Sequence, residues 1–384
     1  MNKKMLYVSE KLEKLKDSKK KTDLVKEAEK ELFRGQCNCA YWHGVFGGLY
    51  LYHLRNAVYE HLIKGEAIID QGLMGKKQCA NVDVRDIDAD GLDEVILENR
   101  DINLYFSPEE GGVLKELDSK KIGQNFINTL RRKKEAYHRK IIKKLQEAAL
   151  KENDDNVKTI HDDIQAVDPS LSEHLSYDWY GRYSLIDHFI SDDTTLADFS
   201  KSSYDELGDF VNGTYEYEVK KTSKGFDLLM KREGEADGAK VLLEKKISFP
   251  SKGTNFAVKY TLTNLEDEKK EFIFGPEFNI IMPEADSDKY KVITSSDKDT
   301  RQLGHLFESK DAESIEIRDT GDKASLLLDL GEKCDIWHFP VKTVSQSEKA
   351  YELNYQGSSI FPHFKVELDA GGSKKFTVKA DIRV

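Results

Sequence analysis

The spacing of hydrophobic residues changes near residue 80, and this change constrains the fold more than any other feature of the chain. Before it, apolar residues recur every three or four positions, as on one face of a helix; one such run is Leu51, Leu54, Val58 and Leu62. After it, apolar and polar residues alternate, which is typical of half-buried strands; two such runs are Phe256, Val258, Tyr260, Leu262 and Phe376, Val378, Ala380, Ile382. The pattern therefore predicts helices first and β-structure after them.

The strand-like runs are separated by turn signals such as Gly371-Gly372-Ser373, without helices alternating between them. This order favours an antiparallel sandwich over a parallel sheet. We expect an α+β fold that is mainly β, with a small helical domain over residues 1–75 and a large antiparallel β-sandwich over residues 80–384. A charged stretch with helical spacing predicts a helical insertion around residues 131–168.

Composition excludes several classes of function. The chain has 384 residues, with 59 Lys and Arg against 70 Asp and Glu, and its net charge of −11 disfavours nucleic acid as a partner. No apolar run approaches the roughly 20 residues that a membrane span needs. The four cysteines show no regular spacing, so we predict no disulfide and expect a cytoplasmic protein.

The most informative local segment is a cluster of polar and aromatic residues that lies between Gly35 and Gly48. It contains Asn38, Tyr41, Trp42 and His43. Sugars offer hydroxyls to polar groups and C–H faces to aromatic rings, so this cluster is a candidate glycan platform. The alternative is a helix–loop–helix corner in which Tyr41 and Trp42 are core residues and the glycines form tight turns.

The run from Arg34 to Leu51, RGQCNCAYWHGVFGGLYL, closely resembles the last signature region of the family 57 glycoside hydrolases, of the α-amylase and 4-α-glucanotransferase type. The resemblance continues through three further segments: Arg182–Phe189, Tyr355–Ser358 and Pro362–Leu368. It implies a catalytic barrel that carries the nucleophile and the acid/base, followed by a helical domain and a β-sandwich. Because the chain resembles only the last two parts, we expect the barrel to be absent and predict no catalytic residue here.

The resemblance also implies substrate contacts. Trp42 and His43 would face the sugar in one wall of an α-glucan cleft, and Asn38 and Tyr41 would support them. Cys39 stands where the best-known family pattern has an aspartate, which leaves a contact at that position in doubt. The partners expected are an α-glucan and either a separate barrel polypeptide or a second copy of this chain. Hydrolysis and glucanotransfer are not separable from the sequence.

A second constellation places acids at alternate positions before a glycine. Asp86, Asp88, Asp90 and Glu94 form a candidate calcium loop, although Leu97 stands where a twelve-residue calcium loop has its last glutamate. The alternative is an Asp-Gly hairpin turn whose acids are solvated. We expect no required cofactor, and calcium is the candidate ion.

Two other functions stay open. One is a stand-alone carbohydrate-binding protein, in which Trp42 or Trp179 would bind glucan. The other follows from the similarity of such a sandwich to the galactose-mutarotase superfold, in which a His and a Glu act as acid and base on a sugar. His188, Glu277 and His363 are the candidates for that role in a sugar epimerase.

Overall fold

The structure is a computed structural model and describes residues 1–18, 22–75, 80–151, 168–297, 299–321, 324–348 and 350–383. It begins with three helices, α1 (Asn2–Asp17), α2 (Thr22–Gly35) and α3 (Tyr52–Met74). Two short 3-10 helices, η1 (Asn38–Tyr41) and η2 (Gly48–Tyr50), lie between α2 and α3. No helix among these described ranges is long and apolar enough to cross a bilayer.

The three helices pack through the apolar faces that their sequence spacing predicts. Their shared core takes residues from all three: Val8, Leu12 and Leu15; Ala28 and Leu32; Val58, Leu62 and Ile69. α2 and α3 approach closely at Gly35, where an added Cβ would lie 2.5 Å from a methyl carbon of Leu62. α3 ends at Gly75, whose φ of +64° suits glycine.

Antiparallel strands follow the helices and form two sheets. The first has the order β1-β2-β3-β4-β5, with β1 (Asn81–Arg85), β2 (Glu94–Glu98), β3 (Ile102–Ser107), β4 (Val113–Ser119) and β5 (Gln124–Asn125). Twelve strands form the second: β6 (Ile186–Ile190), β7 (Glu216–Lys221), β8 (Gly225–Ala236), β9 (Ala239–Pro250), β10 (Asn255–Asn264), β11 (Lys270–Ile280), β12 (Tyr290–Thr294), β13 (Arg301–Gln302), β14 (Phe307–Asp319), β15 (Ser325–Gln346), β16 (Tyr351–Leu368) and β17 (Ser373–Arg383). The expected fold class, helices followed by a mainly antiparallel β-structure, is confirmed.

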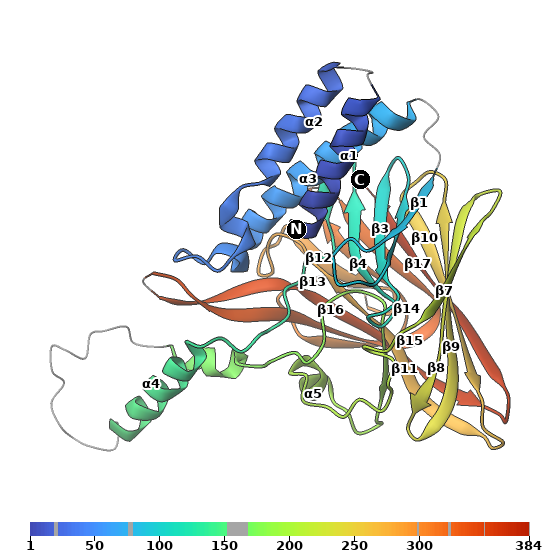
Figure 1. Cartoon of the computed structure of the whole chain (residues 1–384). Helices are drawn as coiled ribbons and strands as arrows, with labels where there is room; N and C mark the ends of the chain where they lie inside the picture. The colour runs from blue at the N-terminus through green and yellow to red at the C-terminus, as the bar shows by residue number, and fades with distance from the viewer. Residues whose placement is uncertain are drawn as a thin grey trace.

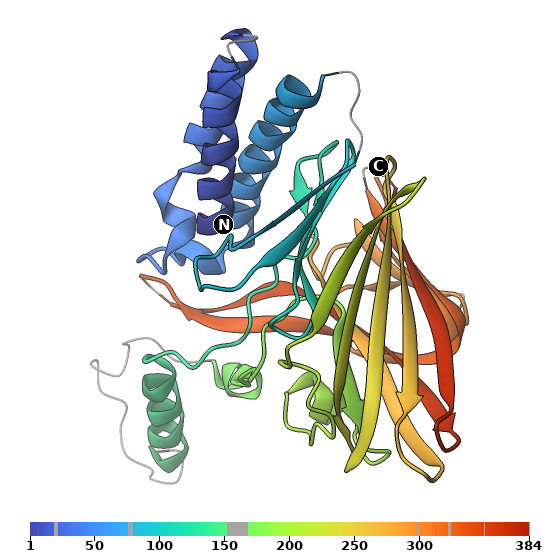
Figure 2. The ribbon, with the colours of Figure 1, turned by 45° about the vertical axis from the view of Figure 1, so that its right-hand side comes forward.

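The five-stranded sheet lies between the helices and the large sheet (Figures 1 and 2). Both sheets contribute to the largest hydrophobic cluster, for example through Leu104 of β3, Leu114 of β4 and Leu243 of β9. The small sheet therefore joins the helical layer to the sandwich.

Part of the predicted insertion is helical. α4 (His138–Lys151) is followed, after residues outside the described ranges, by a 3-10 helix at Pro169–His174. Tyr137, Ile141 and Leu171 pack on Val344 at the far end of the β15–β16 hairpin, away from the body of the sandwich (Figure 1). A short helix, α5 (Leu196–Ser200), follows β6.

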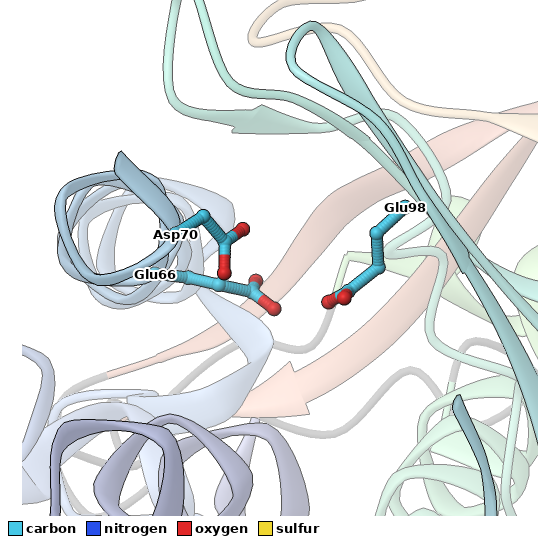
Figure 3. Close-up of side chains that lie close together, drawn as sticks. All are labelled: Glu66, Asp70 and Glu98. Carbon is cyan, nitrogen blue, oxygen red and sulfur yellow. The ribbon is translucent and has the colours of Figure 1, made fainter. Parts of the chain in front are cut away.

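Buried charges connect the helices to the five-stranded sheet. Glu66 and Asp70 of α3 and Glu98 of β2 point toward one another (Figure 3). The ammonium of Lys11, from α1, lies 3.0 Å from Glu66, 2.7 Å from Asp70 and 2.7 Å from Glu98. All four side chains are buried, so this lysine compensates three carboxylates that have little access to water.

Lys4 repeats this arrangement about two turns of α1 away. Its ammonium lies 2.7 Å from Asp118 and donates a hydrogen bond to the Tyr105 hydroxyl. Burial raises the pKa of Asp118 to about 7, although Lys4 opposes that shift. The interface between α1 and the sheet therefore consists of paired charges around a small apolar cluster of Tyr7, Ile96 and Tyr105.

Lys11→Ala is expected to destabilise the chain by about 3–5 kcal/mol, because Glu98 then loses its buried cation. Glu66 keeps its ion pair with Lys4, and Asp70 keeps its ion pair with Lys120. Lys16→Ala is the matched control, since Lys16 is on the same helix and pairs with Glu13 and Glu29 at the surface. Urea unfolding followed by circular dichroism measures both variants. Equal stability of the two variants would show that the buried network contributes nothing.

Candidate functional site

The segment between α2 and α3 forms a tight loop around the Trp42 carbonyl. That oxygen accepts hydrogen bonds from the backbone N–H groups of Gly44 and Leu49. Gly48 has a φ of +51°, and a Cβ there would lie 2.1 Å from the Trp42 oxygen. Only glycine fits this position, so the loop geometry depends on it.

The predicted substrate-binding residues adopt different orientations in this loop. Trp42 is 53% exposed, and Val45 and Phe46 are 60% and 75% exposed. Asn38 is also exposed, whereas Tyr41 is half-buried and its hydroxyl donates to the Gly35 carbonyl at 2.5 Å. The alternative of a helix–loop–helix corner, with both aromatic residues in the core, therefore fits Tyr41 but not Trp42. The indole of Trp42 is available to a ligand.

His43 is held by a strand that is distant in sequence. Its Nε2 lies 3.1 Å from the carbonyl oxygen of Gln346, at the end of β15. A nitrogen that bonds a carbonyl must carry the proton, so Nδ1 is the free acceptor of the neutral ring. The rings of Tyr50 and Tyr137 contact the imidazole edge-on, at centroid distances of 4.9 and 5.6 Å.

A buried arginine fixes the loop to the sandwich. Arg55, on α3, donates to the Leu49 carbonyl at 2.5 Å and to Gln356 Oε1 at 2.8 Å. Gln356 belongs to β16 and has no partner on β15, because Val341 pairs with Gly357 and Lys342 with Tyr355. This bulge directs the Gln356 side chain toward Arg55, and its Nε2 donates to the Tyr50 carbonyl.

Sequence reasoning missed these supporting residues. His43 and Gln346 are 303 positions apart, and Arg55 and Gln356 are 301 apart. The sequence signals were the family resemblance of Tyr355–Ser358 and that of the first signature run, which continues through Arg55, but neither gave Gln356 or Arg55 a role.

The acidic loop brings together three of its four predicted residues. One oxygen from each of Asp86, Asp88 and Glu94 lies within 4.8 Å of the others. Asp90 is not in this group, and its carboxylate accepts from the backbone N–H of Leu92. The Lys115 ammonium lies 3.2 Å from Asp88 and 3.4 Å from Glu94, so a protein cation already compensates these acids.

The donor set suits calcium only in part. Asp88 Oδ1 is buried without a hydrogen-bond partner, which favours a cation there. Both oxygens of Asp86 accept backbone N–H groups, from Asp90 and Gly91, so each already has a partner within the loop. The calcium prediction therefore stays a prediction.

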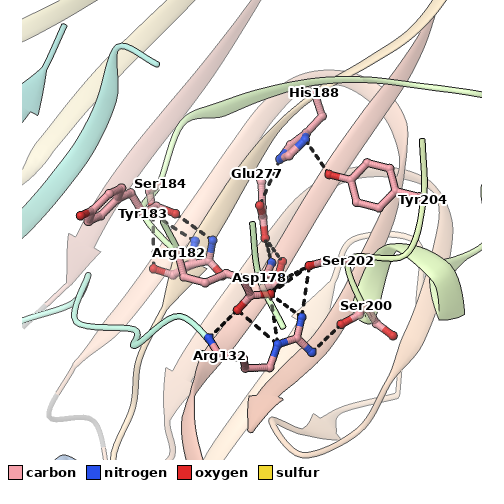
Figure 4. A network of polar contacts seen from close by, with 12 residues as sticks. Arg132, Asp178, Arg182, Tyr183, Ser184, His188, Ser200, Ser202, Tyr204 and Glu277 are labelled. Carbon is pink, nitrogen blue, oxygen red and sulfur yellow. Dashed lines mark hydrogen bonds and ion pairs between the residues drawn. The ribbon is translucent and has the colours of Figure 1, made fainter. Parts of the chain in front are cut away.

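The epimerase candidates His188 and Glu277 lie in a fully buried chain of charges (Figure 4). Asp178 pairs with Arg182 at 2.6 Å, and Arg182 pairs with Glu277 at 2.5 Å. His188 bonds Glu277 through Nε2 at 3.1 Å and Glu206 through Nδ1 at 2.7 Å. Both ring nitrogens thus face carboxylates, which requires both to carry protons.

The electrostatics agree with this arrangement. Burial alone would lower the pKa of His188, but Glu206 and Glu277 raise it to about 9. Burial would raise the pKa of Glu277, but Arg182 and His188 lower it to about 2. Neither side chain is exposed, and both are committed to ion pairs, so the geometry does not support acid/base work on a sugar ring.

The acidic loop can be tested with calcium and Lys115→Met. We expect the melting temperature of the wild type to be unchanged by a chelator, because Lys115 supplies the positive charge. We expect Lys115→Met to melt lower and to recover when calcium is added, since an ion can replace the ammonium. Differential scanning calorimetry measures both, with sodium chloride of equal ionic strength as the control. A lower melting temperature of the wild type in chelator would instead show a resident metal ion.

His188 makes stability depend on pH. Because its pKa in the folded chain is above the unfolded value of 6.5, its contribution is complete below that value and is lost as pH rises through about 9. We expect the urea midpoint to fall between about pH 7 and pH 9, and to fall less in Glu206→Gln, where His188 keeps only one carboxylate. Identical slopes in both proteins would contradict a charged His188.

Comparisons with known proteins agree with this architecture. Residues 1–69 match the family "Alpha-amylase/4-alpha-glucanotransferase, middle domain", and residues 86–378 match "Alpha-amylase/4-alpha-glucanotransferase, C-terminal". The 4-alpha-glucanotransferase of Thermococcus kodakarensis is 34% identical over 342 residues, which are 89% of this chain and 46% of that protein. Alpha-amylase 1 of Dictyoglomus thermophilum is 32% identical over 99% of this chain and 52% of its own length.

One solved structure agrees with these matches over the whole chain. The crystal structure of 4-alpha-glucanotransferase from Thermococcus litoralis superposes with a TM-score of 0.74 and 29% identity, covering 100% of this chain and 48% of that one. A galactose mutarotase-like protein from Lactobacillus casei has a TM-score of 0.46 and 12% identity over 76% of this chain. The chain thus spans about half the length of the curated relatives it matches. It belongs to the α-amylase/4-α-glucanotransferase family of glycoside hydrolases, family 57, and comprises the middle and C-terminal domains of that family.

Proposed function

We propose that this chain forms one wall of the substrate cleft of an α-glucan-processing enzyme, and that its sandwich supports that wall. The observation that carries the proposal is the exposed indole of Trp42 beside a fixed His43. A glucose ring can stack its C–H face on the indole while a hydroxyl donates to Nδ1 of His43. Asn38, exposed in the same loop, offers an amide to further hydroxyls.

Rigidity of the loop supports this role. Binding sites gain affinity when their side chains are ordered before the ligand arrives. Gln346 orients His43, and Arg55 with Gln356 fixes the backbone next to it. The sandwich thereby positions the cleft wall through β15 and β16.

The partner proposed for this wall is a catalytic barrel. Val45 and Phe46 project large apolar side chains into solvent beside Trp42, and exposed apolar groups of this kind mark a surface that is covered in an assembly. The relatives are about twice as long as the region they share with this chain, which leaves room for a barrel in the remainder. The nucleophile and acid/base of glucan cleavage would come from that barrel, and no residue described here is assigned to either role.

Acrylamide quenching of tryptophan fluorescence tests the contact between glucan and Trp42. The chain has three tryptophans, and Trp337 is only 6% exposed. In Trp179→Phe, Trp42 is therefore the main target of the quencher, and we expect saturating maltoheptaose to protect it. In the matched variant Trp42→Phe, the exposed reporter is Trp179, which is 44% exposed, and we expect no protection.

The two variants also separate the alternatives. Protection of Trp179 instead of Trp42 would support a stand-alone carbohydrate-binding protein that uses the sandwich. Protection of neither indole would contradict the proposed cleft wall.

A further inference from the structure

A second face of the large sheet carries aromatic and charged residues in register. Trp337 of β15 pairs with Glu308 of β14, and Asp335 of β15 pairs with His363 of β16. Their neighbour Ile336 points to the main hydrophobic core, whereas Trp337 belongs to a separate cluster. Because side chains alternate along a strand, these residues share the face that is turned away from the core.

This face is hollowed. A depression of about 590 Å³ is lined by Trp337, His363, Asp335 and Glu308, among others. A second depression of about 350 Å³ adjoins it along β6, β11 and β16, and both are lined by Ile190, Ser191, Asp192, Ile273 and Lys365. Volumes of this size accommodate small organic ligands, and the shared lining makes one elongated groove.

Aromatic rings pack together at one end of the groove, where Trp337 and His363 line it and Phe361 and Phe199 lie buried behind them. The rings of Trp337 and His363 have centroids 4.6 Å apart, and those of His363 and Phe361 are stacked at 5.2 Å. Phe199, from α5, stacks on Phe361 at 4.4 Å and covers it. His363 is half-buried and lines the groove; its Nδ1 bonds the Phe361 carbonyl, and its Nε2 is left for a ligand.

The charges of the larger depression are nearly balanced. Four acids, Asp192, Glu308, Asp311 and Asp335, line it together with three lysines, Lys333, Lys365 and Lys374. Carboxylates accept from hydroxyls and ammonium groups donate to them, so a neutral ligand rich in hydroxyls fits better than a polyanion. Asp335 is held in place because its Oδ1 accepts from the backbone N–H of Asp311, which lies at a bulge in β14 with a φ of +53°.

We propose that this groove is a second α-glucan-binding site, separate from the Trp42 loop. The choice of glucan as ligand rests on the proposed function of the chain, whereas the location of the site rests on the groove itself. β15 connects the two places, since Trp337 lines the groove and Gln346 holds His43. Nine residues of extended strand separate them by about 30 Å, so one short oligosaccharide does not reach both.

Isothermal titration of the 384-residue chain with maltoheptaose tests the groove in a Trp42→Ala background, where the loop site is removed. We expect residual binding in that background. We expect His363→Ala, added to it, to weaken that binding at least about tenfold, which corresponds to roughly 1.4 kcal/mol. His305→Ala in the same background is the matched control, because His305 is exposed and does not line the groove.

Asp335→Asn, added to Trp42→Ala, distinguishes the loss of a ligand contact from misfolding. It keeps the size of the side chain and an oxygen for the Asp311 N–H but removes the negative charge, so it is expected to weaken binding without lowering the melting temperature. If His363→Ala lowers the melting temperature, the affinity of the Asp335→Asn variant decides whether the groove binds glucan.

The outcomes separate the two proposals. If Trp42→Ala does not bind maltoheptaose, the proposed groove site is overturned. It is also overturned if adding His363→Ala, Asp335→Asn or His305→Ala to Trp42→Ala gives three variants of equal affinity. Loss of binding in the groove variants without glucan protection of Trp42 would support the groove and contradict the cleft wall.

Discussion

Charge pairing across the interface of the helices and the five-stranded sheet is the interaction on which the rest of the structure depends. Hydrocarbon surfaces can slide past one another at small cost, but buried ammonium and carboxylate groups are stable only in the positions where they meet. Lys4 and Lys11 therefore fix the position of α1 against β2–β4, and Glu66 and Asp70 fix α3. Because α3 also carries Arg55, the same contacts determine where the Trp42 loop lies.

The loop itself is stabilised from two directions. Arg55 contacts it from the helical side, and the β15–β16 hairpin reaches it from the sandwich (Figure 1). The middle and C-terminal domains therefore each supply part of the support of this one loop. For the proposed cleft wall, this gives the sandwich a structural role, since its long hairpin holds His43 through Gln346.

The sequence predicted the helices and strands because burial on one face imposes a period, and runs such as Leu51–Leu62 and Phe256–Leu262 show it clearly. It also identified the Trp42 loop, whose glycines and aromatic residues are adjacent in the chain. It could not identify Gln346, Lys115 or the groove around His363, because those contacts join residues that are distant in sequence and depend on strand register. The likeness to epimerases brought His188 and Glu277 to attention, but only the structure shows that arginine and glutamate partners enclose them.

The bulge at Gln356 has an evolutionary consequence. It lies on β16 between the groove and the tip of the hairpin, so it separates a part of the strand pair that belongs to the sheet from a part that projects beyond it. An insertion or deletion beyond the bulge would rotate or shorten the tip and release His43, yet the pairing of Asp335 with His363 would be unchanged. The length of the hairpin tip can therefore change while the sandwich stays the same.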